Sequence, residues 1–469
     1  MPPSGVVDSD FFGSSLGASS RGFTRPPRPG GVFDAHPTHF YYRAIEEQRA
    51  IGSPKLERAR VRENNETSGD HCRPGLARRA SAFGQSVWSY VDTIVDSHPG
   101  IIFFGSGAPS DELYPRERLA WAAAQTFANP GPAFDYGELQ GYEPLRELIA
   151  ARMTRQGIAI NADQLMITTG SQQGLDHVAK LFINPRDLLA VEAPTYIGAL
   201  QAFDPYEPEY LAVPIDDDGL DVAELARALD RAGRSPKFLY TAPTFQNPTG
   251  ITMTLPRRKA LVALARERGF TILEDDPYGE IYFGDPPPPA IRTLDPETIY
   301  LGTFSKVLAP GIRVGWLTAP SDLLNRLMMI KEAVDIHGDR TITRTVYNAS
   351  KDFLDEHVAE SREVYRLRRD AMLTALTELM PDDVAWSHPD GGFFVWITLP
   401  PGVSGTKFLP YAADHGVAFL PGAWFYPKGQ EQDNAIRLNF SRLNEAKIRL
   451  GIEKLSAALA SYAQEMTMR

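Results

Sequence analysis

The sequence predicts an α/β fold built on a mostly parallel, doubly wound sheet. Short apolar runs alternate with amphipathic helical stretches from about Ser81 onward, and this alternation is typical of parallel strands covered by helices. The helical stretches include residues 175–182 and 256–268. We expect strands at residues 165–169, 188–192, 238–241, 271–274, 299–302 and 314–317.

The composition is that of a globular protein. The 469 residues, of which 43% are hydrophobic and 23% charged, are enough for more than one domain core. A net charge of -11 argues against binding to nucleic acid or to an anionic membrane. The single cysteine, Cys72, excludes an intramolecular disulfide and a metal cluster of several thiolates. With one cysteine the simplest compartment is a reducing cytosol, and no membrane-spanning run or N-terminal signal pattern is found. We expect a cytoplasmic protein, and we assign no metal site.

Residues 1–80 differ from the rest of the chain in composition. They are rich in Gly, Ser, Pro and Arg, and runs such as residues 25–31 cannot sustain a helix or a strand. Three interpretations compete: a disordered extension, a segment that packs against a partner subunit, and a translation start placed too far upstream. We favour a disordered or flexible N-terminal extension.

Ligands of doubly wound sheets bind at the carboxyl ends of the strands, so the residues that follow each expected strand are candidates for a site. Ser171 and Gln172 follow the first strand and open an amphipathic helix, whose free N–H groups can hold an anion or need only an ordinary cap. Tyr196 follows the second strand and can stack on a flat ligand or serve as a core residue.

The next three strand ends carry groups of different chemistry. Asn247 lies in a rigid turn between two prolines after the third strand. Two adjacent carboxylates, Asp275 and Asp276, follow the fourth strand, where burial without a cation would be costly. Thr303, Ser305 and Lys306 follow the fifth strand, and Arg313 lies seven residues beyond the lysine. Each feature alone has an ordinary structural explanation, but together they indicate one shared ligand.

The order and spacing of these residues resemble the fold-type I pyridoxal-phosphate enzymes, and within them the class I/II aminotransferase family. The most specific segments are residues 305–316, SKVLAPGIRVGW, and residues 247–250, NPTG. The branch with 2-aminoadipate and kynurenine aminotransferases is the most similar, from about Phe83 to the C-terminus. The resemblance implies a pyridoxal 5'-phosphate enzyme that moves the amino group of an L-amino acid to a 2-oxo acid, plausibly 2-oxoglutarate, by a ping-pong mechanism.

The resemblance also assigns roles to residues. Lys306 would carry the cofactor as a Schiff base and move the substrate proton, with its pKa lowered by the pyridinium ring and Arg313. Asp275 would pair with the ring nitrogen, because it lies three residues before Tyr278, and Asp276 receives no role. Asn247 and Tyr278 would bind the phenolic oxygen of the ring, and Tyr196 would stack on it. The phosphate would be bound by Ser171, Gln172, Thr303, Ser305 and Arg313.

Three further residues are assigned in the same way. Tyr136, in residues 135–146, would reach the cofactor phosphate of a neighbouring subunit, which implies a homodimer with shared sites. Arg437 would bind the substrate α-carboxylate, although an arginine in an alternating strand can equally face solvent. Gly107 would lie near the substrate with its backbone exposed.

The resemblance implies two folded domains. We expect a large cofactor domain at residues 130–335 and a smaller α+β domain made from residues 81–129 and 336–469. The second part of the small domain, with a closing helix at residues 445–462, fits an antiparallel sheet backed by helices.

The substrate is the least determined feature of the sequence. Residues 83–91, which cover the site in the family, contain no arginine for a distal carboxylate. Trp88 and Tyr90 there either favour apolar or aromatic substrates or pack within the small domain. Two alternative functions remain: another pyridoxal-phosphate reaction, such as decarboxylation, elimination or cyclisation, and a pyridoxal-phosphate-binding transcription regulator. The regulator is disfavoured because residues 1–80 lack helix–turn–helix periodicity.

Overall fold

The computed structural model describes residues 75–84 and 86–468, and the predictions for residues 1–74 lie outside this range. Residues Asp70–Arg469 form one compact unit. Its first element is the 3-10 helix η1 (Arg78–Ala82), where Nε of Arg78 donates to Glu207 at 2.9 Å. The last residues of the predicted extension therefore contact the body of the unit. The division of the unit into a large and a small domain stays a prediction.

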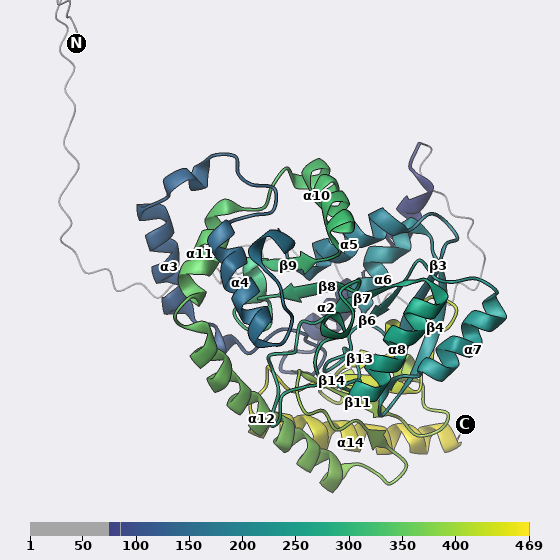
Figure 1. Cartoon of the computed structure of the whole chain (residues 1–469). Coiled ribbons are helices and arrows are strands. Elements are labelled where there is room, and N and C mark those ends of the chain that lie inside the picture. Colours follow the sequence, from purple (N-terminus) through teal and green to yellow (C-terminus); the bar gives the residue numbers. More distant parts are fainter. Residues whose placement is uncertain (1–74, 85, 469) are drawn as a thin grey trace, which may run out of the picture. The chain divides into compact units, whose positions relative to one another are not determined.

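The main sheet has eight strands. Their bounds are β2 (Met166–Thr168), β3 (Leu188–Ala193), β4 (Glu209–Asp216), β5 (Gly219–Leu220), β6 (Phe238–Thr241), β7 (Thr271–Asp275), β8 (Ile299–Thr303) and β9 (Gly315–Thr318). The strand order is β2-β9-β8-β7-β6-β3-β4-β5, and Figure 1 labels the six strands from β9 to β4. Each of the six expected strands is present within one residue at either end, whereas β4 and β5 were not predicted.

The sheet is mostly parallel, as predicted, but it is mixed at its ends. Strands β4, β3, β6, β7 and β8 run parallel to their neighbours in that order. Strand β9 is antiparallel to both β2 and β8, and β5 is antiparallel to β4. The carboxyl ends of β3, β6, β7 and β8 therefore meet at one edge, where a ligand is expected.

Helices cover both faces of this sheet. Leu189 and Val191 of β3 pack on one face with α5 (Ser171–Phe182), α6 (Ile197–Phe203) and α10 (Ser321–Asp335). Leu188 and Ala190, one residue out of phase, pack on the other face with α7 (Val222–Ala232) and α8 (Leu255–Arg268). Since successive side chains of a strand point to opposite faces, burial on both sides explains the uninterrupted apolar runs.

The C-terminal part forms a four-stranded antiparallel sheet, as predicted. Its strands, in the order β10-β11-β14-β13, are β10 (Ala385–Trp386), β11 (Phe394–Thr398), β13 (Leu420–Pro421) and β14 (Ala435–Asn439). Helices α12 (Leu354–Leu379) and α14 (Glu445–Met468) lie side by side along it (Figure 1). Strand β1 (Ile102–Phe103) pairs with β12 (Val417–Ala418) and joins the segment before the large sheet to this part.

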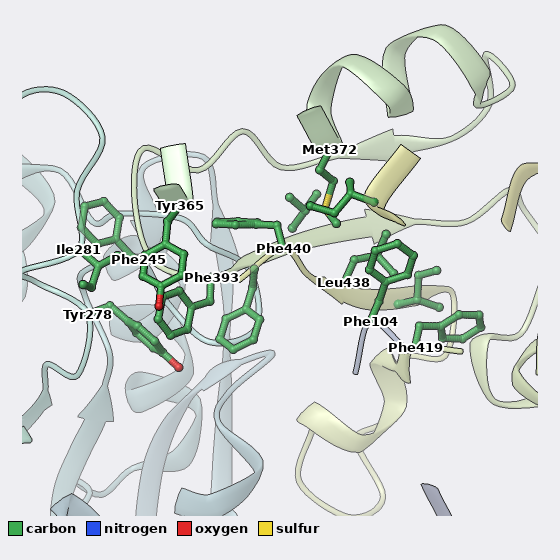
Figure 2. Packing of buried hydrophobic residues seen from close by; sticks show 14 of the residues in the cluster. Phe104, Phe245, Tyr278, Ile281, Tyr365, Met372, Phe393, Phe419, Leu438 and Phe440 are labelled. Atoms are coloured by element: carbon green, nitrogen blue, oxygen red, sulfur yellow. The ribbon is translucent and has the colours of Figure 1, made fainter. Parts of the chain in front are cut away.

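A large apolar cluster connects the antiparallel sheet with the site. Figure 2 shows Phe104, Leu438 and Phe440 in its interior and Tyr278 at its edge beside Phe393. The ring centroids of Tyr278 and Phe393 are 5.4 Å apart. The phenol of Tyr278 is therefore fixed by core packing before any ligand binds.

The remaining helices complete the unit. They are α2 (Val87–Ser97), α3 (Arg116–Ala128), α4 (Glu143–Arg155), α9 (Ile291–Leu294), α11 (Arg340–Ser350) and α13 (Gly405–Asp414). The other 3-10 helices are η2 (Asp111–Leu113), η3 (Gly131–Phe134), η4 (Ala162–Gln164), η5 (Asp204–Tyr206), η6 (Pro310–Ile312) and η7 (Gly422–Phe425). Within residues 75–84 and 86–468, no helix is long and apolar enough to cross a membrane.

Candidate active site

One cavity of about 380 Å³ opens at the carboxyl ends of the central strands. Every predicted site residue except Tyr136 lines it: Gly107, Ser171, Gln172, Tyr196, Asn247, Asp275, Tyr278, Thr303, Ser305, Lys306, Arg313 and Arg437. The wall also contains Trp88, Ala108, Tyr240, Ala242, Pro277 and Pro310. In the part of the chain that the structure describes, no group of three or more His, Cys, Asp or Glu side chains could hold a metal ion.

Lys306 presents its amine inside the cavity, three residues after β8 ends. Its Nζ donates to the carbonyl of Gly107 at 2.8 Å and lies 5.6 Å from the centroid of the Tyr278 ring. The pKa of Lys306 is lowered to about 8, first by burial and next by the charge of Arg437, whereas Asp275 acts in the opposite direction. Arg313, the residue predicted to lower this pKa, also lowers it, but burial and Arg437 have larger effects. An amine with this pKa is partly unprotonated near neutral pH and can act as a nucleophile or a base.

Asp275 ends β7 with one carboxylate oxygen unpaired. The hydroxyl of Tyr240 donates to Oδ2 at 3.1 Å, whereas Oδ1 is buried and has no hydrogen-bond partner among the described residues. Burial raises the pKa of Asp275 to about 7, against the hydrogen bond from Tyr240, which lowers it. A buried acceptor on a cavity wall without a donor fits a ligand that carries an N–H group, as a protonated pyridine ring does.

Asp276, which received no role from the sequence, has a structural one. Its carboxylate accepts from the hydroxyl of Tyr300 at 3.0 Å and from the N–H of Gly279 at 2.8 Å. It does not line the cavity. The structure thereby supports Asp275, and not its neighbour, as the carboxylate at the site.

The N-terminus of α5 and Arg313 form a cationic end of the cavity. Gly170 precedes the helix with φ of +74°, a conformation that favours glycine, and a Cβ there would lie 2.4 Å from Nη2 of Arg313. Nη1 of Arg313 donates to Oγ of Ser305 at 3.4 Å, and the hydroxyl of Thr303 donates to the same oxygen at 2.9 Å. A helix N-terminus, a guanidinium and hydroxyl groups fit a phosphate.

Gln172 takes part through its backbone. Its side-chain amide donates to the carbonyl of Gly198 at 2.6 Å. The N–H at this first turn of α5 has no partner within the helix, so it can bind an anion. The side chain of Gln172 instead joins the first turn of α5 to α6.

Three polar side chains surround the middle of the cavity. Burial raises the pKa of Tyr196 to about 12, and burial also raises the pKa of Tyr278. Both phenols therefore stay protonated and can donate hydrogen bonds. Oδ1 of Asn247 accepts from Nη1 of Arg437 at 2.9 Å, so its NH₂ group is oriented as a donor.

Arg437 also lines the cavity and is 2% exposed, so it is not the solvent-facing residue that an alternating strand also permits. Its Nη2 donates to the carbonyl of Gly105 at 2.7 Å, and its Cζ lies 4.1 Å from the centroid of the Phe394 ring. Burial lowers the pKa of Arg437 to about 10. Among the described residues its hydrogen bonds go to an amide oxygen and to backbone carbonyls, and its buried Nε has no partner, which fits an anionic ligand such as a substrate carboxylate.

Two predicted residues lie outside this cavity. Tyr136 is 82% exposed and packs edge-on against His337, with ring centroids 5.7 Å apart. Tyr90 packs edge-on against Trp424, with ring centroids 6.0 Å apart, whereas Trp88 lines the cavity. Two interpretations were open for the aromatic residues of segment 83–91. The position of Trp88 favours contact with a substrate, and that of Tyr90 favours packing within the protein.

Sequence reasoning missed Tyr240. This residue lies inside β6, one position before the strand ends, and shares a face with Phe238. A phenol hydroxyl in a fully buried strand needs a hydrogen-bond partner, and this is the signal that could have identified it.

Comparison with known proteins gives consistent results. Residues 99–455 match the protein family described as aminotransferase class I and II. The chain is 42% identical over 368 residues to aromatic-amino-acid aminotransferase 1 of Thermococcus litoralis, covering 76% of this chain and 88% of the relative. It is 39% identical over 367 residues to 2-aminoadipate transaminase of Thermus thermophilus, covering 77% of this chain and 90% of the relative. The structure of Pyrococcus horikoshii kynurenine aminotransferase in complex with PMP matches with a TM-score of 0.78 at 38% identity. The match covers 83% of this chain and 97% of that structure's chain.

Proposed function

This chain belongs to the aminotransferase class I and II family and is an aminotransferase that uses pyridoxal phosphate, and we propose that its amino donor has an apolar or aromatic side chain. The observation that carries the proposal is Trp88 on the cavity wall. The only cations on the described wall are Lys306, Arg313 and Arg437. Each of them is assigned to the cofactor or to the α-carboxylate, so none is left for a distal carboxylate on the donor.

The cavity residues fit the chemistry of the cofactor. When bound, pyridoxal phosphate supplies an aldehyde that a lysine amine can attack and a pyridinium ring that withdraws electrons from the substrate Cα–H bond. Lys306 would hold the cofactor at its aldehyde carbon, with loss of the aldehyde oxygen as water, and its Nζ, once freed by the substrate amine, would carry the Cα proton. Asp275 accepts the ring N–H on Oδ1, and Arg313 and Ser171 hold the phosphate.

Arg437 orients the amino acid. Its guanidinium binds the α-carboxylate with paired hydrogen bonds, and the bond from Nη1 to Oδ1 of Asn247 at 2.9 Å keeps the NH₂ group of Asn247 directed as a donor. Tyr278 donates from a phenol that burial keeps protonated. The apolar walls around these groups exclude water and strengthen each electrostatic contact.

The active enzyme is a homodimer in this proposal. Phe127 and Phe134 are 60% and 64% exposed, with ring centroids 6.0 Å apart, and Tyr136 lies two residues beyond Phe134. Exposed aromatic groups of this kind are unusual on a monomer and typical of an interface. A second copy would cover them and place its own Tyr136 at this cavity.

The substrate proposal is tested by adding single amino acids to the purified enzyme and following the cofactor absorbance. We expect phenylalanine, tyrosine, leucine or kynurenine to convert the bound cofactor to its amine form faster than 2-aminoadipate or aspartate. Adding the 2-oxo acid of the same donor should reverse the change. Faster conversion by 2-aminoadipate would contradict the proposed donor class, and release of CO₂ or ammonia would indicate a second reaction.

The dimer is tested by mixing two variants, each of which lacks one residue of the shared site. In a hybrid of Lys306→Ala and Tyr136→Phe copies, one site lacks both residues and the other has both. We expect the hybrid to bind cofactor at one site with the affinity of the unaltered enzyme. Shared sites would be contradicted if analytical ultracentrifugation shows a monomer. They would also be contradicted if no site of the hybrid binds cofactor more tightly than the sites of the two parent variants.

A further inference from the structure

Thr169, just before the first turn of α5, is held by side chains through both of its backbone groups. Its N–H donates to Oε1 of Gln173 at 2.8 Å. Its carbonyl accepts from Nη2 of Arg313 at 3.3 Å. The peptide groups of Thr169 therefore connect Arg313, on the cavity wall, to Gln173, which does not line the cavity.

An ion pair on α10, whose lysine is buried and whose aspartate is partly exposed, holds Gln173 in turn. Nε2 of Gln173 donates to Oδ2 of Asp335 at 2.8 Å. Nζ of Lys331 donates to the two oxygens of Asp335 at 2.8 and 2.6 Å, and the Lys331 side chain is 0% exposed. Since a buried ammonium needs its counter-ion, Asp335 cannot easily turn away from Lys331. The orientation of the Gln173 amide is consequently fixed.

We propose that Gln173, supported by Asp335 and Lys331, is a positioning residue for the phosphate-binding end of the site. The proposal rests on the proposed assignment of Arg313 and the first turn of α5 to the cofactor phosphate. Gln173 does not touch the phosphate itself. It holds the Thr169 peptide, and through it the donors that do.

The close packing at Gly170 makes these donors dependent on one another. A Cβ at Gly170 would lie 2.4 Å from Nη2 of Arg313, so the turn and the guanidinium have little room between them. The hydroxyl of Thr168 donates to the carbonyl of Gly170 at 2.9 Å and fixes the other side of the turn. If the Thr169 peptide rotates, the first N–H groups of α5 and the Arg313 guanidinium must move with it.

The competing explanation is that Gln173 only stabilises the start of α5. In that case its loss would lower the unfolding temperature and weaken every ligand of the cavity to a similar degree. A positioning role instead predicts a loss confined to ligands that carry a phosphate. Pyridoxal phosphate and pyridoxal, which differ in that group, separate the two explanations.

The test uses the full-length enzyme freed of cofactor, and Gln173→Met, which keeps chain length and helix propensity but removes both hydrogen bonds. We expect the dissociation constant of pyridoxal phosphate to rise about tenfold, the size expected for a lost hydrogen bond at a charged site, and that of pyridoxal to stay unchanged. Gln201→Met, on the exposed side of α6, makes the same chemical change away from the site and should alter neither constant.

Two outcomes overturn the proposal: an unchanged affinity for pyridoxal phosphate, and an equal loss for both aldehydes. If Gln173→Met does not fold, the same measurement is made on the double variant Lys331→Met/Asp335→Leu. This variant keeps Gln173 but removes the hydrogen bond from Gln173 to Asp335 and the ion pair that holds Asp335. The same selective loss is expected there. If the unaltered enzyme binds both aldehydes equally well, the phosphate assignment itself fails, which is a separate result.

Discussion

The hydroxyl of Tyr240 donates a hydrogen bond to Oδ2 of Asp275 at 3.1 Å, and both groups are fully buried. This bond leaves Oδ1 as the carboxylate oxygen without a partner. It also favours the ionised form of Asp275, because it counteracts the rise in pKa that burial causes. Tyr240 therefore orients Asp275 and keeps it charged for the ring nitrogen of the cofactor.

Tyr240→Phe should lower kcat/KM for amino transfer by about 10- to 100-fold, the range for a hydrogen bond to a charged group. The absorbance of the bound cofactor should also titrate at a shifted pH, because Asp275 becomes harder to ionise. Tyr206→Phe is the matched control, since it removes a bond of the same kind, from Tyr206 to Asp176 at 3.0 Å, outside the cavity. Unchanged kinetics and titration in Tyr240→Phe would contradict the role.

Cofactor capture by the cofactor-free enzyme should depend on the pKa of Lys306. That pKa is lowered to about 8 by burial and by Arg437, so the amine is protonated below this pH and neutral above it. Since only the neutral amine attacks an aldehyde, the rate constant for capture should rise about tenfold between about pH 7 and about pH 9 and then level off. Stopped-flow absorbance measures it.

The charges around Lys306 predict opposite shifts of this profile. Asp275 raises the pKa of Lys306, so Asp275→Asn should move the midpoint to lower pH. Arg437 lowers the pKa of Lys306, so Arg437→Met should move the midpoint to higher pH. Shifts in the same direction would contradict this electrostatic account, and Lys306→Ala should show no capture at all.

Arg437→Met should raise KM for the amino acid and lower kcat/KM by at least about 100-fold, because it removes the paired donors for the α-carboxylate. Cofactor affinity should change less, since the hydrogen bonds of Arg437 go to Asn247 and to the carbonyls of Gly105 and Ser106, and not to the residues assigned to the phosphate. Arg442→Met is the control: Arg442 follows β14 and pairs with Asp111 at 2.5 Å, and it does not line the cavity. A fall in kcat with an unchanged KM would exclude carboxylate binding.

The residues after the strands were predictable from the sequence for a geometric reason. Strands β3, β6, β7 and β8 are parallel, so the turns that follow them meet at one edge. Tyr196, Asn247, Asp275 and Lys306 each lie within a few residues of such an end. Their convergence depends only on strand order and direction, which the alternation of apolar runs and helices indicates.

Contacts made through packing were not predictable in this way. Gln173 and Asp335 are separated by 162 residues, and their hydrogen bond depends on how α10 packs on α5. Strand β4 was missed although residues 210–213 are apolar, because Pro214 interrupts the run and a proline argues against a strand inside a sheet. For Arg437 the alternating pattern predicts a strand but not which face is buried, and only the packing on Phe394 decides it.

Trp88 should determine the preference for large side chains. It lies in the first turn of α2 and lines the cavity, at 39% exposure, where a substrate would cover its ring. Trp88→Ala should lower kcat/KM for phenylalanine or tyrosine by about 10- to 200-fold, the range for losing apolar contact in a pocket. The value for alanine should change much less, because its methyl group is too short to reach the indole.

Tyr90→Ala separates this effect from a general loosening of α2. Tyr90 lies on the same helix and packs on Trp424, with ring centroids 6.0 Å apart, but it does not line the cavity. Its loss should therefore affect phenylalanine and alanine to the same degree, whereas Trp88→Ala should change their ratio. An unchanged ratio in Trp88→Ala would mean that other parts of the wall select the substrate, and the proposed donor class would lose its main support.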